Sequence, residues 1–266
     1  MSCRQGAAQR WLGRASRLFP AHFVGERAYG EHPRQRLDCY EPVVRQYSKR
    51  PLLVFFYGGS WRTGSKADYE FVGRSLAARG LDVAVVDYRL YPEVGFPAFV
   101  EDGARAVSVL ASDHTKRQIV LIGHSAGAHI AAMLALDRQY LRAWQVADDT
   151  IVGLIGLAGA YDFTPIRDPV LQNVFGSVED WPASQPINFV EKSSPPMVLL
   201  HGLADDTVTP GNSRRLAAAA RTKGVPADLR LLPGINHSGL IGRVALPRLW
   251  PGVDIAGAVV DAASRF

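Results

Sequence analysis

The pentapeptide Gly-His-Ser-Ala-Gly at residues 123–127 constrains this chain more than any other stretch. An apolar run over residues 119–122 precedes it, and an alanine-rich segment over residues 128–135 that predicts a helix follows it. A strand, a tight Gly-x-Ser-x-Gly turn and a helix are the parts of a nucleophile elbow, which lifts a serine hydroxyl out of a sheet. Glycines beside the serine avoid crowding by a Cβ. We expect Ser125 to be a catalytic nucleophile; the alternative is a structural glycine turn.

Apolar runs alternate with helical segments along most of the chain, which predicts a mainly parallel sheet with helices on both faces. Two short strands, at residues 23–29 and 36–40, are expected to begin the sheet as an antiparallel pair. The other expected strands cover residues 52–57, 81–87, 119–122, 151–157, 196–201 and 229–232. The expected helices cover residues 66–79, 128–135, 212–223 and 254–264, with another ending near residue 112. We expect residues 1–266 to form a single α/β domain.

Two segments lie outside this alternation. Residues 9–19 carry apolar side chains at helical spacing with arginines between them, which predicts an amphipathic helix that packs on the body of the protein or docks on a membrane surface. Residues 162–195 contain five prolines and little periodicity, and they follow a strand on the side where α/β sheets bind ligands. We expect them to form a short lid or cap; the alternative is a surface connection.

Composition excludes several classes of protein. Hydrophobic residues make up 47% of the chain and charged residues 21%, so a sizeable core can form. No apolar run reaches about 18 residues, so we expect no transmembrane helix. The first residues have no apolar stretch behind them, so no secretory signal is expected. Two cysteines, Cys3 and Cys39, are too few for a disulfide framework, and we expect them reduced in a cytoplasmic protein.

The charge distribution argues against nucleic-acid binding. The net charge is +5, and residues 1–50 carry ten Lys or Arg against four Asp or Glu, so the basic excess lies outside the body that holds Ser125. No basic patch with interleaved aromatics and no known nucleic-acid module accompanies it. The chain has no dinucleotide fingerprint, no phosphate-binding loop and no zinc-protease motif, and its seven histidines are scattered. We therefore expect no metal and no organic cofactor.

A serine nucleophile needs a base, and in this arrangement the acid and then the histidine follow the serine in the chain. Three histidines come after Ser125. His129 would lie along the helix that the serine opens, and His201 is expected to be a structural turn residue at the end of a strand. His237 follows the last strand, in a loop expected at the carboxyl edge of the sheet. We therefore predict His237 as the base.

The acid is expected on the loop after the preceding strand, where it would hold Nδ1–H of the base. Asp205 and Asp206 both lie on that loop, and Asp162, after the previous strand, is a weaker rival. The oxyanion of a tetrahedral intermediate needs backbone N–H donors. One is expected from Ala126, and others from the loop at residues 58–60, where glycine lets the backbone come close to the reacting carbonyl.

These motifs together resemble the α/β-hydrolase superfamily from about residue 27 to the end of the chain, and within it the carboxylesterase branch of feruloyl-esterase-like enzymes and kynurenine formamidases. The pieces that carry the resemblance are Tyr29-Gly30 with Arg34–Asp38, Gly58–Trp61, Asp87–Leu90, Phe96-Pro97 with Asp102, and Gly123–His129. The resemblance implies the α/β-hydrolase fold and hydrolysis by an acyl-enzyme, with no cofactor.

The resemblance also selects among the candidates. The late motif H-G-x-x-D-x-x-V of the family matches His201, Gly202, Asp205 and Val208, which implies that Asp205 is the acid. The family's oxyanion donors correspond to the N–H groups of Gly59, Ser60 and Ala126. The chain departs from the family at Tyr57, because relatives usually carry histidine before the two glycines, where that side chain braces the oxyanion loop.

We therefore predict a serine hydrolase that cleaves carboxylic esters of small to medium acyl groups through Ser125, Asp205 and His237. The alternative is an arylformamidase, in which the same residues hydrolyse an N-formylkynurenine-type amide. A non-catalytic ligand-binding protein on the same fold is a third hypothesis, because fold alone does not guarantee function. The expected partner is a small-molecule ester or amide, and a homodimer is compatible with the sequence.

Overall fold

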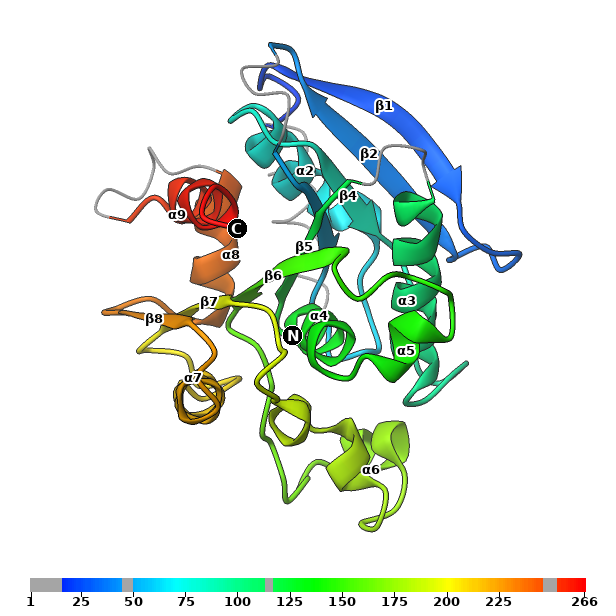
Figure 1. The fold of residues 1–266 in the computed structure, drawn as a ribbon, viewed down its shortest axis with the longest axis vertical. Coiled ribbons are helices and arrows are strands. Elements are labelled where there is room, and N and C mark those ends of the chain that lie inside the picture. Colours follow the sequence, from blue (N-terminus) through cyan, green and yellow to red (C-terminus); the bar gives the residue numbers. More distant parts are fainter. Residues whose placement is uncertain (1–15, 45–49, 113–116, 246–252) are drawn as a thin grey trace.

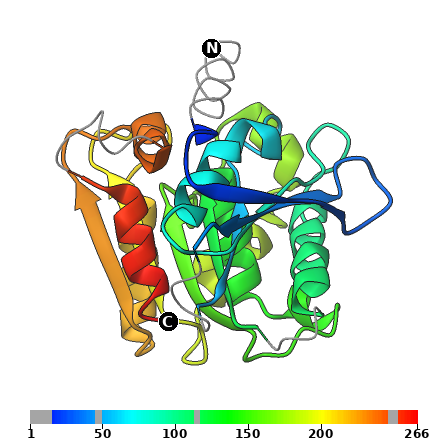
Figure 2. The ribbon, with the colours of Figure 1, turned by 90° about the horizontal axis from the view of Figure 1, so that it is seen from above.

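The computed structural model describes residues 16–44, 50–112, 117–245 and 253–266, which form a mixed sheet in the order β1-β2-β4-β3-β5-β6-β7-β8. The strands are β1 (Ala21–Ala28), β2 (Arg36–Pro42), β3 (Leu52–Phe56), β4 (Val83–Val86), β5 (Ile119–His124), β6 (Ile151–Leu157), β7 (Met197–Gly202) and β8 (Ala227–Leu232). β2 pairs antiparallel with β1 and β4, and every pair from β4 to β8 is parallel. The predicted sheet with an antiparallel beginning is confirmed, and β1 and β8 form its two edges (Figures 1 and 2).

Helices cover both faces of the sheet, as expected for parallel strands joined by helical crossovers. The 3₁₀ turns are η1 (Lys66–Tyr69), η2 (Trp181–Ser184) and η3 (Pro186–Phe189). The α-helices are α2 (Glu70–Ala77), α3 (Ala98–Ala111), α4 (Ala126–Leu136), α5 (Gln139–Arg142), α6 (Pro169–Phe175), α7 (Gly211–Thr222), α8 (His237–Ala245) and α9 (Ile255–Ala263). Helices α2, α8 and α9 pack together on one face, and α3, α4, α5 and α7 cover the other (Figure 1).

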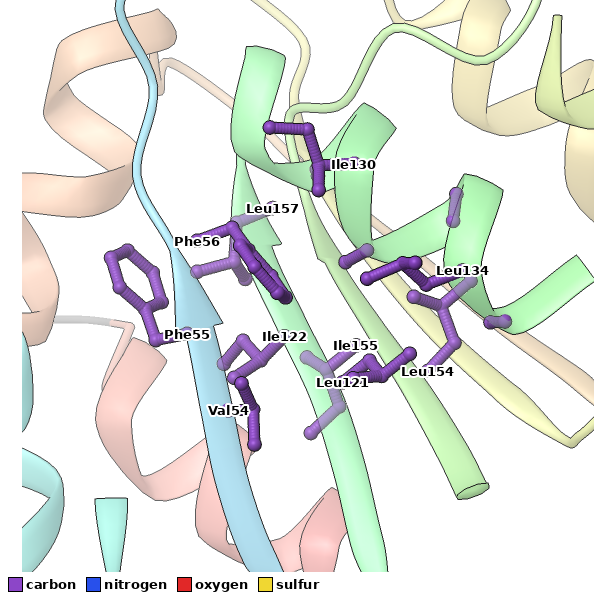
Figure 3. Packing of buried hydrophobic residues seen from close by; sticks show 14 of the residues in the cluster. Val54, Phe55, Phe56, Leu121, Ile122, Ile130, Leu134, Leu154, Ile155 and Leu157 are labelled. Atoms are coloured by element: carbon purple, nitrogen blue, oxygen red, sulfur yellow. The ribbon is translucent and has the colours of Figure 1, made fainter. Parts of the chain in front are cut away.

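The core lies where the central strands meet α4. Side chains of β3, β5 and β6 interdigitate with Ile130 and Leu134 of α4 (Figure 3). Burying one Val, Leu, Ile or Phe side chain stabilises the fold by about 1.5–3 kcal/mol relative to leaving that side chain exposed. Every residue of α4 is buried and the helix has no polar face, so it needs cover on its outer side as well. The turn η3, in the segment predicted as a lid, contacts α4 and supplies part of that cover.

The structure differs from the sequence prediction near the C-terminal end. His237 was expected in a loop, but it is the first residue of α8, which the sequence did not predict. Gly239 and Gly242 lower the intrinsic helix propensity of this segment by about 1 kcal/mol each relative to alanine, so no helical signal stood out. Tertiary packing overrides that preference, because the apolar residues of α8 are buried and the helix contacts α2.

Most of the helix predicted at residues 9–19 lies outside the described residues. Residues 162–195 are described, and they hold α6, η2 and η3 rather than an open connection. Among the described residues, no helix combines the length and apolar character needed to cross a bilayer.

Candidate active site

The turn between β5 and α4 holds Ser125 in a backbone conformation that few non-glycine residues adopt, with φ 56° and ψ −121°. Such a conformation costs about 1–3 kcal/mol. The backbone of neighbouring segments passes so close that a Cβ at Gly123 would lie 2.2 Å from the Gly127 oxygen, and one at Gly127 would lie 2.1 Å from the Phe56 oxygen. Ser125 N–H donates to the Leu157 carbonyl of β6 at 2.9 Å, which ties the strained turn to the sheet.

Three predicted side chains meet above this turn. The His237 imidazole lies between the other two, with Nε2 2.8 Å from Ser125 Oγ and Nδ1 2.7 Å from Asp205 Oδ2. The carboxylate can only accept, so Nδ1 carries the proton and Nε2 of the neutral ring accepts from the serine hydroxyl. The Asp205 side chain is fully buried and that of His237 retains 12% exposure. An imidazole placed in this way can remove the serine proton while the carboxylate fixes its tautomer.

Asp205 is held by donors on both oxygens. Backbone N–H groups of Thr207 and Val208 donate to Oδ1 at 3.0 and 2.9 Å. The second oxygen faces His237 and, at 3.3 Å, Nε2 of His201. Burial alone would raise the pKa of the Asp205 carboxyl, but the hydrogen bonds from His201, His237 and Val208 outweigh it and hold this pKa well below its usual value. The Asp205 carboxyl is therefore ionised at neutral pH.

The side chains of the alternative candidates for the acid and the base make no hydrogen bond to the side chain of Ser125 or His237 in the structure. Asp206 is exposed to solvent, and Asp162 pairs with Arg215 on α7. His129 donates from Nε2 to the Ser184 carbonyl at 2.8 Å, and so turns away from the elbow. His201, expected to be only a turn residue, instead contacts Asp205, a role that its spacing of four residues before the aspartate could have suggested.

The sequence predicts no role for His124, the residue before the serine. It is buried, and its Nε2–H donates to the backbone carbonyl of His237 at 3.3 Å, which links β5 to the start of α8. Burial, reinforced by the nearby His237, lowers the pKa of His124 well below its usual value. This second imidazole therefore stays neutral and adds no positive charge beside the predicted base.

The predicted oxyanion loop lies against the elbow. A Cβ at Gly58 would lie 2.9 Å from both Ser125 Cβ and His124 Nδ1, so only glycine allows this approach. Gly59 follows with φ 144° and Ser60 with φ 53°, while the Gly59 carbonyl turns to accept N–H bonds from residues 62 and 63. Ala126 begins α4, where the first N–H groups of a helix lack intrahelical acceptors. This geometry suits donation of the predicted N–H groups to a substrate oxygen.

Tyr57 connects this loop to a buried polar network. Its ring is fully buried and stacks on Tyr88, with the ring centroids 4.6 Å apart. Its hydroxyl donates to Asp87 Oδ1 and accepts from the Arg34 guanidinium at 2.8 Å. The same guanidinium group donates to the carbonyl of Gly64, at the far end of the loop. Burial, with the nearby Tyr88 and Asp87, raises the pKa of Tyr57 well above its usual value, so the hydroxyl keeps its proton.

We expect Tyr57→Phe to lower stability by about 1–3 kcal/mol, because Asp87 and Arg34 would lose a buried partner. We also expect it to lower kcat by about tenfold with little change in KM, because a loosened loop weakens contacts made in the transition state. Urea unfolding and steady-state kinetics on a short-chain ester measure both effects. An unchanged kcat in a destabilised variant would show that the network supports the fold alone.

Aromatic rings pack beside the loop and bring the segment at 162–195 to the site. Trp61, which follows the predicted donor Ser60, lies with its ring centroid 4.8 Å from Phe175 of α6 and 5.9 Å from Phe163. His129 of α4 lies 5.1 Å from Trp61 in an edge-to-face contact. These contacts join the oxyanion loop, the helix of the elbow and the candidate lid in a single apolar wall.

Acid should destabilise the protein through His129. Burial lowers the pKa of this imidazole from 6.5 to about 4, so between these values the unfolded chain binds more protons than the folded one. The contribution is complete above pH 6.5 and is lost as the pH falls towards 4. We expect wild type to lose about 2 kcal/mol more stability between pH 7.5 and 5 than His129→Gln, whose amide keeps a donor for Ser184.

Urea titrations at the two pH values measure this difference. His22→Gln, at an exposed position, is the matched control and should behave as wild type. Equal pH dependence in His129→Gln and wild type would contradict the prediction.

Within the described ranges, no group of three or more His, Cys, Asp or Glu side chains is arranged to hold a metal ion.

Comparisons with known proteins agree with this fold. The BD-FAE family model matches residues 37–219, more than half of the chain. A probable isoprenylcysteine alpha-carbonyl methylesterase of Oryza sativa subsp. japonica is 30% identical over 241 residues, which cover 80% of this chain and 56% of that protein. The chain thus spans little more than half the length of this relative. A kynurenine formamidase of Salmo salar is 34% identical over 141 residues, which cover 52% of this chain and 46% of that protein.

Solved structures extend the likeness along nearly the full length. The crystal structure of esterase B from Lactobacillus rhamnosis (HN001) has a TM-score of 0.80 and 21% identity, with coverage of 99% of this chain and 93% of that chain. At this identity the likeness establishes the fold. Together with the match to the family model, it shows that this chain belongs to the BD-FAE family and has the α/β-hydrolase fold.

Proposed function

We propose that this protein is a serine hydrolase that cleaves carboxylic esters of small to medium acyl groups. The observation that carries the proposal is the His237 imidazole, which contacts Ser125 Oγ at 2.8 Å and Asp205 Oδ2 at 2.7 Å above a strained elbow. Ester hydrolases among the relatives support the same chemistry.

In the proposed reaction, Ser125 Oγ attacks the ester carbonyl while its proton passes to His237 Nε2. The N–H groups of Gly59, Ser60 and Ala126 receive the oxyanion. His237 then returns the proton to the leaving alcohol, and the carbonyl re-forms as an acyl-enzyme. Water attacks the acyl-enzyme with the same imidazole as base, which releases the acid and restores Ser125.

Residues 162–195 are proposed to cap this site. The contacts of Phe163 and Phe175 with Trp61, which follows the predicted oxyanion donor Ser60, support this proposal. A single domain and a cytoplasmic location stay predictions from the sequence, and a homodimer stays compatible with it.

A fluorophosphonate probe tests the proposal directly. The folded protein should react with one equivalent of probe, and peptide mass spectrometry should locate the adduct on Ser125. A p-nitrophenyl ester should give a burst of nitrophenol matched to the enzyme concentration if deacylation is slow. Absence of labelling, with no hydrolysis of any ester or amide offered, would instead favour a non-catalytic ligand-binding protein.

An arylformamidase is the second candidate, and the similarity to a kynurenine formamidase over 141 residues favours it. The two candidates share nucleophile and base, so a comparison of kcat/KM separates them. Simple p-nitrophenyl esters of increasing acyl length, a methyl ester of an isoprenylated cysteine and N-formylkynurenine form the panel. A preference for the formamide would replace the ester proposal and leave the mechanism in place.

A further inference from the structure

His201 is a fully buried imidazole at the end of β7 that the proposed reaction does not use. Both of its ring nitrogens have partners. Nδ1 lies 2.7 Å from the hydroxyl of Ser213 on α7, and Nε2 lies 2.8 Å from the backbone carbonyl of Val208. The same Nε2 lies 3.3 Å from Asp205 Oδ2, the oxygen that also faces His237.

These partners determine where the proton of His201 resides. A backbone carbonyl only accepts hydrogen bonds, so Nε2 must carry the hydrogen that faces Val208 and Asp205. In the tautomer with its single hydrogen on Nε2, Nδ1 is an acceptor and the Ser213 hydroxyl donates to it. Ser213 is also fully buried, so no water competes for either group. Ser213 thus donates to His201, and the Nε2–H of His201, shared between the Val208 carbonyl and Asp205 Oδ2, faces the same carboxylate oxygen that accepts from His237.

We propose that His201, held in this tautomer by Ser213 and Val208, is a positioning residue that fixes the Asp205 carboxylate towards His237. The inference rests on the proposed function, because a carboxylate needs this orientation only if His237 acts as a base. His201 contacts no reacting atom and acts through Asp205.

A buried carboxylate needs hydrogen-bond donors on both oxygens. Two backbone donors hold Oδ1, whereas the donor on Oδ2, His237 Nδ1–H, belongs to a ring that gains and loses a positive charge during the reaction, so its pull on Oδ2 changes. A second N–H on Oδ2 supplies a fixed donor and spreads the negative charge, which limits how strongly the carboxylate attracts the His237 proton. Among the described residues, His124 is the other titratable side chain shown against His237, and it stays neutral, so changes at His201 should reach the base through Asp205.

The decisive variants are His201→Met and His201→Gln. Methionine fills a similar volume without a donor, whereas the glutamine amide can donate to both Val208 and Asp205. We expect His201→Met to lower kcat by about 10–100-fold with KM changed by less than about twofold. We also expect the acid limb of its kcat/KM profile to move to higher pH by about half a unit, because an uncompensated carboxylate favours the protonated base. His201→Gln should restore kcat to within about threefold of wild type.

The proposal would be overturned if His201→Met had the same kcat as wild type and the same acid limb in its kcat/KM profile. A glutamine variant as impaired as the methionine variant would also overturn it, because shape rather than donation would then matter. If His201→Met fails to fold, Ser213→Ala provides the second test, since it keeps the ring and removes only the donor to Nδ1. We expect it to shift the acid limb in the same direction by a smaller amount, and no shift would count against the proposal.

A spectroscopic readout separates this inference from the proposed function. The Nδ1–H of His237 should give a low-field proton resonance in the folded enzyme without substrate, and histidine labelled with ¹⁵N assigns it. The resonance should persist in His201→Gln and move or broaden in His201→Met. If Ser125→Ala keeps full activity, the proposed function fails while this resonance still reports on the Asp205 contact. If Ser125→Ala is inactive and the resonance is the same in wild type and in His201→Met, only the positioning role of His201 fails.

Discussion

Ser125→Ala should lower kcat for ester hydrolysis by about a millionfold, to the residual rate that the oxyanion donors and substrate binding sustain. Without the hydroxyl no acyl-enzyme can form, although His237 and Asp205 keep their contact. The substitution removes one oxygen atom at a position with 8% exposure, so the fold should be retained. Pre-steady-state kinetics with a p-nitrophenyl ester measure the loss, and a variant as active as wild type would refute the nucleophile.

The same position offers a stability test that does not depend on substrate. Alanine keeps a Cβ at φ 56°, whereas glycine relieves the strain of about 1–3 kcal/mol. Glycine also makes the unfolded chain more flexible, at a cost of about 0.4–1 kcal/mol. We therefore expect Ser125→Gly to be about 1 kcal/mol more stable than Ser125→Ala in urea unfolding, with both inactive. A glycine variant less stable than the alanine variant would show that the elbow stores no strain.

Much of the fold could be predicted because the parallel strands are continuous apolar runs. Every residue from Ile119 to His124 is buried in the structure, and the predicted strand over 119–122 lies within that range. Helix α8 was not predicted for the opposite reason, since two glycines weaken its local helical signal and the helix is held by packing against α2, α9 and β7. The helical turns at residues 162–195 escaped because each is at most seven residues long, too short for a periodic pattern.

The candidate site could be predicted where chain order carried the information. The order of elbow, acid and histidine is readable from sequence, whereas the choice of Asp205 over Asp206 needed the family resemblance. The structure brings Ser125, Asp205 and His237 within hydrogen-bond distance. The supporting contacts could not be predicted in this way. Tyr57 and Asp87 meet across neighbouring parallel strands, and Arg34 reaches them from a turn before β2. Such contacts depend on the register between distant segments, which no local pattern records.

Asp205→Asn should lower kcat by about 10⁴-fold, although the two side chains have nearly the same shape. Four N–H groups face the carboxylate, from Thr207, Val208, His201 and His237. An amide NH₂ cannot accept, so it must take the place of one oxygen and face a donor. The two backbone donors on Oδ1 cannot change, which leaves the NH₂ at Oδ2, opposite the imidazoles.

His237 can satisfy that NH₂ only by accepting through Nδ1, which moves its own proton to Nε2. Nε2 would then donate to Ser125 and could no longer remove the serine proton, so the loss should appear in kcat rather than KM. Asp206→Asn is the matched control, because it makes the same change at an exposed neighbour and should keep wild-type kinetics. Steady-state kinetics on a short-chain ester distinguish the two variants. A large loss in Asp206→Asn together with an active Asp205→Asn would move the acid to the adjacent position and invalidate the positioning role of His201.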